Sequence, residues 1–150
     1  MSERHTFFMM IQDKWWKEFL RRKGEGKETH AYVLRGAAPP KTALRILFYV
    51  TKPVAEVAGH AEFIERKVGT PEALWETNGE ESVLSSEKYD EIVRGSDKVS
   101  FVRFKNLHEA AKPVPLNDVL MFFGVRRLSR KGFYVDKDKA DKLVAMMSQA

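Results

Sequence analysis

One stretch of the chain, Arg45–Glu65, most constrains what the sequence can fold into. Residues 46–50 are a continuous run of apolar and aromatic side chains, which is typical of a β-strand buried on both faces. Pro53 ends this run, because proline has no amide hydrogen to offer to a central ladder. A second strand is predicted over Val57–Ile64, with Gly59 at a bulge or at a close backbone approach. The two strands predict a hairpin at the centre of a small barrel, whose closure removes exposed sheet edges.

The remaining elements combine strand and helix patterns and predict an α+β fold with a mixed or antiparallel sheet. Further strands are expected over 5–10, 25–36 and 98–107, and helices over 12–22, after Thr70, after Ser85, from Asn117 to Phe123, and after Asp136 or Asp138. No repeat or low-complexity tract marks a boundary, so residues 1–150 are predicted to form one domain. We therefore expect a small β-barrel of roughly five to seven strands, closed or nearly closed, with helices packed outside.

Composition favours some classes of partner and excludes several kinds of chemistry. The chain carries 26 Lys and Arg against 21 Asp and Glu, a net charge of +5 with a pI near 9.4. Such a charge favours a polyanionic partner, although many proteins carry it for solubility alone. The absence of cysteine excludes disulfides, thiolate metal sites and cysteine nucleophiles, and it favours a cytoplasmic location. No apolar stretch approaches the roughly 18 residues of a membrane span, so no membrane association is expected.

The sequence lacks the spacings that hold metals, cofactors or activated nucleophiles. The four histidines are scattered without HxH or HExxH spacing: His5, His30, His60 and His108. Neither a GxxxxGK[ST] nor a GxGxxG motif is present, and serine-nucleophile signatures are absent as well. We therefore expect no metal and no cofactor.

Basic side chains are the strongest candidates for binding. They gather near the first Gly-rich turn, on the strand after residue 98 and close to the C-terminal end. The predicted ligand-binding residues are Lys27, His30, Tyr32, Arg35, Lys41, Arg45, Arg103, Lys105, Arg126, Arg127, Arg130 and Lys131. Such cations add sequence-independent affinity for phosphates, and a neighbouring ring such as Tyr134 could stack on an unpaired base. Alternatively these charges form a solvated surface.

Trp15 and Trp16 are expected to pack in the core, the alternative being a ring exposed for stacking.

The order of several short motifs resembles the PUA-like superfamily and, within it, the ASCH-type domains. A helix leads into a Gly26–Lys27 turn and a strand that ends in Arg35. The central hairpin follows, with Gly59 in its second strand, and then a helical segment that contains Leu74–Glu76. A late strand, KVSFVRF, runs into the connector KPVPL. The resemblance covers nearly the whole chain and implies a small PUA-like β-barrel that binds RNA or modified bases. A few similar domains hydrolyse acetylated cytidine or cut RNA.

The resemblance also implies which residues would act if the chain were an enzyme, namely Lys27, Thr29 and Glu62. In the similar acetylcytidine amidohydrolases the Thr lies three places after the Lys, whereas that place is His30 here, and one residue reverses the face of a strand. We therefore favour a protein that binds RNA, another single-stranded nucleic acid or a modified nucleobase through a basic cleft. The alternatives are an N4-acetylcytidine amidohydrolase-like enzyme, a ribonuclease and a protein-interaction domain.

Overall fold

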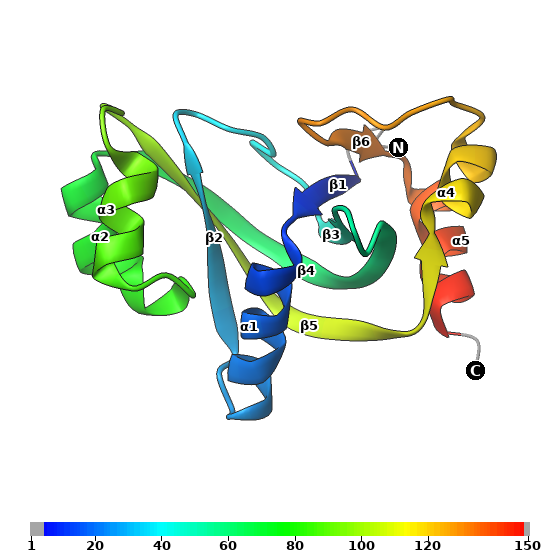
Figure 1. Ribbon diagram of the computed structural model, residues 1–150, viewed down its shortest axis with the longest axis horizontal. Coiled ribbons are helices and arrows are strands. Elements are labelled where there is room, and N and C mark those ends of the chain that lie inside the picture. Colours follow the sequence, from blue (N-terminus) through cyan, green and yellow to red (C-terminus); the bar gives the residue numbers. More distant parts are fainter. Residues whose placement is uncertain (1–4, 149–150) are drawn as a thin grey trace.

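The computed structural model describes residues 5–148 and contains one strongly bent sheet surrounded by helices (Figure 1). Within these residues the sheet has six strands in the order β2-β5-β4-β3-β1-β6. The pair β1 and β3 is parallel, and the other neighbouring pairs are antiparallel. The strands are β1 (Thr6–Ile11), β2 (Thr29–Arg35), β3 (Arg45–Val50), β4 (Glu56–Gly69), β5 (Val99–Pro115) and β6 (Phe133–Val135). The predicted α+β class with a mixed sheet is confirmed.

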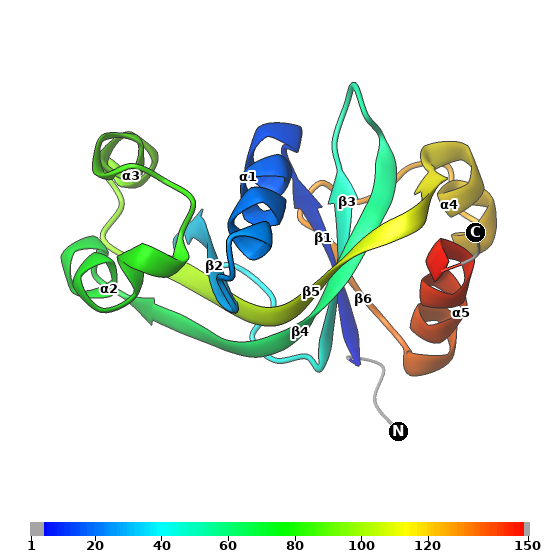
Figure 2. The ribbon, with the colours of Figure 1, turned by 90° about the horizontal axis from the view of Figure 1, so that it is seen from below.

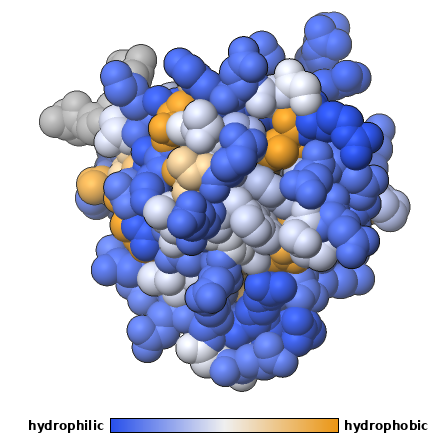
Figure 3. Space-filling view, turned by 90° about the vertical axis from the view of Figure 1, so that its left-hand side faces the viewer, coloured by the Kyte–Doolittle hydropathy of each residue, from blue (hydrophilic) through white to orange (hydrophobic). Residues whose placement is uncertain are grey.

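In the described part of the chain, five α-helices and one 3₁₀ turn surround this sheet. They are α1 (Asp13–Gly24), α2 (Pro71–Asn78), η1 (Gly79–Glu81), α3 (Ser86–Val93), α4 (Leu116–Phe123) and α5 (Lys137–Ser148). The long strands β4 and β5 run the length of the molecule, with α2 and α3 at one end and α4 and α5 at the other (Figures 1 and 2). The face at the α2 and α3 end is mostly hydrophilic (Figure 3). Within residues 5–148, no helix combines the length and the apolar character that crossing a membrane requires.

Three groups of buried side chains form the core, one for each set of helices. The first lies between α1 and the inner face of the sheet and includes Phe19, Phe48 and Phe104. The second lies under α4 and α5, and the third lies between α2, α3 and the strands β2 and β5. Alternation along β2 sends successive side chains to two different groups, since Ala31 belongs to the third and Tyr32 packs against the first.

The central hairpin forms as predicted, and Gly59 shows why the sequence needs glycine there. The register of β4 shifts on both of its sides near this residue. A Cβ atom at Gly59 would collide with the ring of Trp16 and with the backbone oxygen of His108. Trp16 is 4% exposed and packs in the first core group, which confirms the core prediction for this ring. Trp15 is partly buried and packs against the core, with the Lys14 ammonium over its ring.

The helix starts were predicted correctly where a short polar side chain caps them. The hydroxyls of Thr70 and Ser85 accept hydrogen bonds from the backbone N–H groups of Ala73 and Lys88. In the same way Asp136 accepts from the backbone N–H of Lys139 at 2.9 Å before α5.

Two predicted boundaries were wrong because sheet pairing continues beyond the local signal. The first strand, predicted over 5–10, extends to Ile11, which pairs with Val50. The Pro-rich connector is the end of β5, where Pro115 pairs with Glu56. As a consequence α4 begins at Leu116, and Asn117 does not cap it.

A candidate nucleic-acid site between β1 and β2

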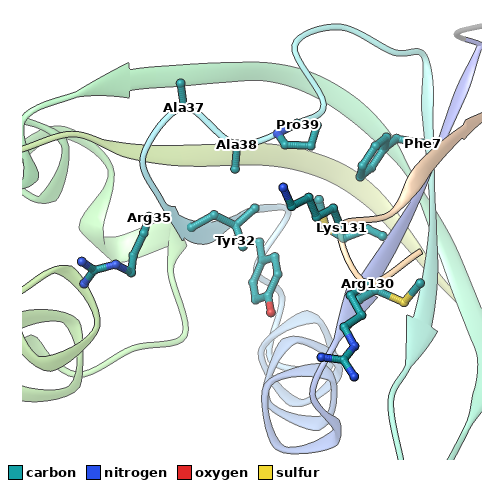
Figure 4. Close-up of a pocket in the computed structure, with 11 residues that line it drawn as sticks. Phe7, Tyr32, Arg35, Ala37, Ala38, Pro39, Arg130 and Lys131 are labelled. Carbon is teal, nitrogen blue, oxygen red and sulfur yellow. The ribbon is translucent and has the colours of Figure 1, made fainter. Parts of the chain in front are cut away.

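A cavity of about 430 Å³ lies between β1 and β2 (Figure 4). These two strands are not neighbours in the sheet, because the hydrogen-bonded order runs from β2 around to β1 and β6. Their side chains therefore face each other across a gap that no ladder fills. The lining residues come from β1, β2, the loop after β2 and the loop after α4: Phe7, Met9, Met10, Tyr32, Leu34, Arg35, Ala37, Ala38, Pro39, Arg130 and Lys131.

Tyr32 provides an aromatic wall of the cavity. It stands on the face of β2 that points toward the first core group, and its ring makes an edge contact with Phe19. Burial disfavours the phenolate and raises the pKa of the Tyr32 hydroxyl to about 12. The side chain is therefore a neutral phenol at physiological pH, able to donate or accept one hydrogen bond.

Two loops are braced so that they form the other walls. Tyr134 makes an edge contact with Phe7, with ring centroids 5.1 Å apart, and its hydroxyl accepts a hydrogen bond from the backbone N–H of Lys41 at 3.1 Å. This contact ties the loop after β2 to β6. Gly132 has φ +79°, and a Cβ there would collide with the Phe7 ring and the Phe8 backbone oxygen. The loop after α4 is therefore pressed against β1 at this glycine.

Arg130 and Lys131, which immediately precede Gly132, bring positive charge to the cavity (Figure 4). Both side chains are exposed, and no carboxylate among residues 5–148 forms an ion pair with either of them. Arg126 and Arg127 lie earlier in the same loop and are also exposed, but they do not line the cavity. The cavity thus combines an apolar, aromatic interior with two cations that no carboxylate of the described residues neutralises.

Arg35 lines the cavity but its guanidinium serves another purpose. Its Nη1 donates hydrogen bonds to the backbone oxygens of Ile92 and Arg94, each at 2.8 Å, at the end of α3. Figure 4 shows the side chain directed away from Tyr32 toward the helices. Arg35 was predicted to bind a ligand, but its guanidinium is engaged with backbone oxygens outside the cavity. A cation at the carbonyl end of a helix is favourable, which explains this position physically.

Lys27 lies in a separate hollow of about 550 Å³, next to the end of α1. Thr29, His30, Lys105 and Asn106 line the same hollow. The His30 ring is 1% exposed, it stacks on Phe104, and its Nδ1 has no hydrogen-bond partner among the described residues. Burial, followed by the charge of Lys27, lowers the pKa of His30 to about 4, so this imidazole is neutral at pH 7.

Glu62 does not join Lys27 in that hollow. It lines a neighbouring one, where it accepts a hydrogen bond from the Asn106 side-chain amide at 3.1 Å and pairs with Lys105 at 3.5 Å. Lys27, Arg35 and Glu62 therefore line three different hollows and do not converge on one pocket. The strand order explains the result, because β5 lies between β2 and β4.

The other predicted basic residues are dispersed over the surface. Arg103 is held by Glu81 and Glu65, and Arg45 pairs with Asp141 at 3.0 Å. Lys41 is exposed on the loop after β2. Sequence reasoning missed the contribution of β1, chiefly Phe7, Met9 and Met10. The short apolar run in which they lie signals a strand, but no local pattern indicates that this strand faces β2 across a gap.

Comparison with known proteins assigns this architecture. No family model matches the chain. A curated relative, the "ASCH domain-containing ribonuclease" of Zymomonas mobilis, is 28% identical over 134 residues, which are 89% of each chain. The crystal structure of ASCH from Zymomonas mobilis superposes with a TM-score of 0.79 over 95% of each chain at 22% identity. The crystal structure of a mutant of that protein superposes with a TM-score of 0.77, over 97% of this chain and 98% of the mutant's chain.

The fold is that of the Zymomonas ASCH structures, an α+β domain built on a bent mixed sheet. In sequence as well as in fold, the chain is similar to a protein named for its ASCH domain. The family resemblance stated from the sequence is thereby confirmed.

Proposed function

We propose that this protein binds single-stranded RNA and places one unpaired base in the cavity between β1 and β2. The observation that carries the proposal is the pairing of an aromatic, thioether-lined interior with two cations, Arg130 and Lys131. The cavity's 430 Å³ lies within the range of small-molecule sites, about 300–1,000 Å³. The name of the Zymomonas relative, a ribonuclease, favours RNA over other polyanions.

The chemistry of the lining matches the two parts of a nucleotide. An unpaired base stacks well on aromatic rings and on apolar side chains, and Tyr32 and Phe7 offer rings at this cavity. The neutral phenol of Tyr32 can exchange a hydrogen bond with a base edge. Arg130 and Lys131 would contact phosphates, and Arg126 and Arg127 would extend this contact along the loop. A modified base fits the same description.

The test is a titration of a fluorescently labelled single-stranded oligoribonucleotide at several salt concentrations. Replacing both Arg130 and Lys131 by Ala should weaken binding for all sequences alike. It should also flatten the plot of log affinity against log salt by about 0.7 for each phosphate that the variant no longer neutralises. A matched control replaces two exposed lysines elsewhere, Lys112 and Lys139, and should change the slope far less.

A second variant, Tyr32→Leu, tests the base site. Affinity should fall by about 5- to 150-fold, the range for removal of one stacked base, while the salt dependence stays unchanged. The proposal is overturned if the wild type shows no binding at low salt, or if the basic double variant behaves like its control.

Cleavage of the bound RNA is a second candidate function, favoured by the name of the Zymomonas relative. It predicts that the labelled oligonucleotide shortens on a denaturing gel during incubation, and that Tyr32→Leu slows the shortening. An oligonucleotide of unchanged length after prolonged incubation supports binding alone.

A further inference from the structure

A third hollow, of about 320 Å³, contains three of the four histidines, His5, His60 and His108. It lies where β1 and β3 begin and where β4 and β5 pass beside them. Its other lining residues are Leu44, Arg45, Ala61, Glu62 and Asn106. It shares no lining residue with the cavity between β1 and β2. We call it the histidine hollow.

Two imidazoles are placed face to face in this hollow by the sheet register. His60 of β4 pairs with His108 of β5, and their rings stack with centroids 4.9 Å apart and planes inclined by 26°. Among the side chains and backbone of residues 5–148, neither imidazole has a hydrogen-bond partner. Two ring N–H groups are therefore available to an acceptor that enters the hollow.

Arg45 supplies a permanent positive charge beside the pair. Its Nη1 contacts Asp141 Oδ1 at 3.0 Å, and its side chain is 26% exposed. A guanidinium has five N–H donors, so this single contact leaves several for a ligand. Burial, then the neighbouring His108, then Arg45 lower the pKa of His60 to about 4. The hollow is thus a cluster of cationic and potentially cationic groups in which protonation of His60 is suppressed.

The negative groups around the hollow are already engaged. Glu62 is bonded to Asn106 and Lys105, and Asp141 is shared between Arg45 and Lys137 of α5. His5, just before β1, also faces the hollow, and its pKa is lowered by burial and by Arg45, with Asp141 opposing. An added anion would therefore meet donors from three strands and no uncommitted carboxylate among these groups.

We propose that the histidine hollow binds a phosphate group, with Arg45, His60 and His108 as its donors, and that binding takes up a proton. An oxyanion between the imidazoles and the guanidinium would replace their mutual repulsion with attraction, which favours the imidazolium form. Leu44, which is 65% exposed at the rim, offers an apolar surface to the organic part of a nucleotide. The proposal is independent of RNA binding at the other cavity, because the two sites use different residues.

The first experiment uses sulfate, which stays a dianion between pH 5 and 8, so that only the protein titrates. Histidine ring resonances are followed by NMR on the full chain. Sulfate should shift the signals of His60 and His108 but not those of the buried His30. The binding should be at least about fivefold tighter at pH 5.5 than at pH 7.5, because the imidazolium form is favoured at the lower pH. Sulfate that moves none of these signals, or moves all of them alike, overturns the proposal.

Variants then separate this site from the proposed RNA cavity. His108→Gln should weaken sulfate binding at least fivefold, and His60→Gln provides a second test if the first variant folds poorly. Arg130→Ala with Lys131→Ala should leave sulfate binding unchanged. If that double variant abolishes sulfate binding while His108→Gln does not, the ion binds at the other cavity and the proposal fails.

Competition identifies the source of the phosphate. Displacement of sulfate by adenosine 5′-monophosphate supports a terminal phosphate. Displacement by a short oligoribonucleotide without terminal phosphates supports a backbone phosphodiester. Displacement by neither overturns the assignment to a phosphate group, because the hollow would then accept only an adventitious ion.

Discussion

Arg103 donates two parallel hydrogen bonds to Glu81, from Nε to Oε1 at 2.8 Å and from Nη2 to Oε2 at 2.9 Å. Nη1 of the same guanidinium reaches Glu65 on β4. The Asn78 side-chain amide donates to Glu81 Oε1 at 2.8 Å. One arginine on β5 therefore fixes the α2–η1 segment to the sheet. Bidentate pairs of this kind are both directional and strong.

This contact predicts an acid-sensitive contribution to stability. Burial would raise the pKa of Glu81, but hydrogen bonds from Arg103, Thr29 and Asn78 outweigh it and lower the pKa to about 2. The unfolded chain therefore takes up the proton first as the pH falls. Ionised Glu81 contributes about 3 kcal/mol to the free energy of unfolding above pH 4.5. This contribution is lost as the pH falls from 4.5 to 2.

The measurement is urea unfolding of wild type and Glu81→Gln between pH 7 and 3. The variant should be less stable by about 2–3 kcal/mol at pH 7, and the difference should shrink as the pH approaches 3. Glu80→Gln is the matched control, because Glu80 is exposed and forms no ion pair within residues 5–148. A constant difference at every pH would contradict the assignment.

The buried His30 leads us to predict a second loss of stability on acidification, in a higher pH range than that of Glu81. Its folded-state pKa of about 4 lies below the ordinary 6.5, so the unfolded chain binds the proton first. The contribution of His30 to the free energy of unfolding is fully present above pH 6.5. It is lost as the pH falls from 6.5 to 4, which lowers the free energy of unfolding by about 3 kcal/mol. His60 acts in the same direction, because its pKa is lowered to about 4 as well.

His30 packs between two phenylalanine rings, and its replacement by the non-titrating Phe should flatten the stability profile between pH 6.5 and 4. His60→Gln should flatten it separately, since the two rings lie in different hollows. Thermal unfolding across this range measures both effects. A His30→Phe profile that is parallel to that of the wild type would show that His30 is not the titrating group.

The close packing around Gly59 predicts that any side chain added there destabilises the fold. Gly59→Ala should destabilise the protein by about 1–3 kcal/mol, because the new methyl group collides with Trp16 and with the backbone at His108. Gly69→Ala on the same strand is the control, since a Cβ there meets only ordinary contacts with Leu74 at 3.6–3.9 Å. Equal stability of the two variants, measured by denaturant unfolding, would contradict this account.

The parts of the fold that the sequence predicted are those with local causes. The hairpin around Pro53 and the caps at Thr70 and Ser85 depend on residues close in the chain, and they formed as expected. Arg35 was predicted to bind a ligand from its charge. The sequence could not show that its guanidinium contacts the end of α3, because that contact joins residues 57 positions apart.

The candidate site was harder to predict because its walls are distant in sequence. Tyr32, Arg130 and Lys131 were identified from their chemistry, but Phe7 was not. The gap between β1 and β2 is a property of strand order, which no pattern within one strand encodes.

The last prediction concerns the amidohydrolase alternative, which requires Lys27, Thr29 and Glu62 to act on one carbonyl. Lys27 and Thr29 share a hollow, but the Thr29 hydroxyl is engaged with Glu81 and Glu62 faces the histidine hollow. A general base must lie within hydrogen-bond reach of the proton that it abstracts. We therefore expect no acetate release when the protein is incubated with N4-acetylcytidine or with acetylated RNA. The outcome against this expectation is turnover that Lys27→Ala abolishes and that Lys23→Ala, a change at the same hollow, preserves.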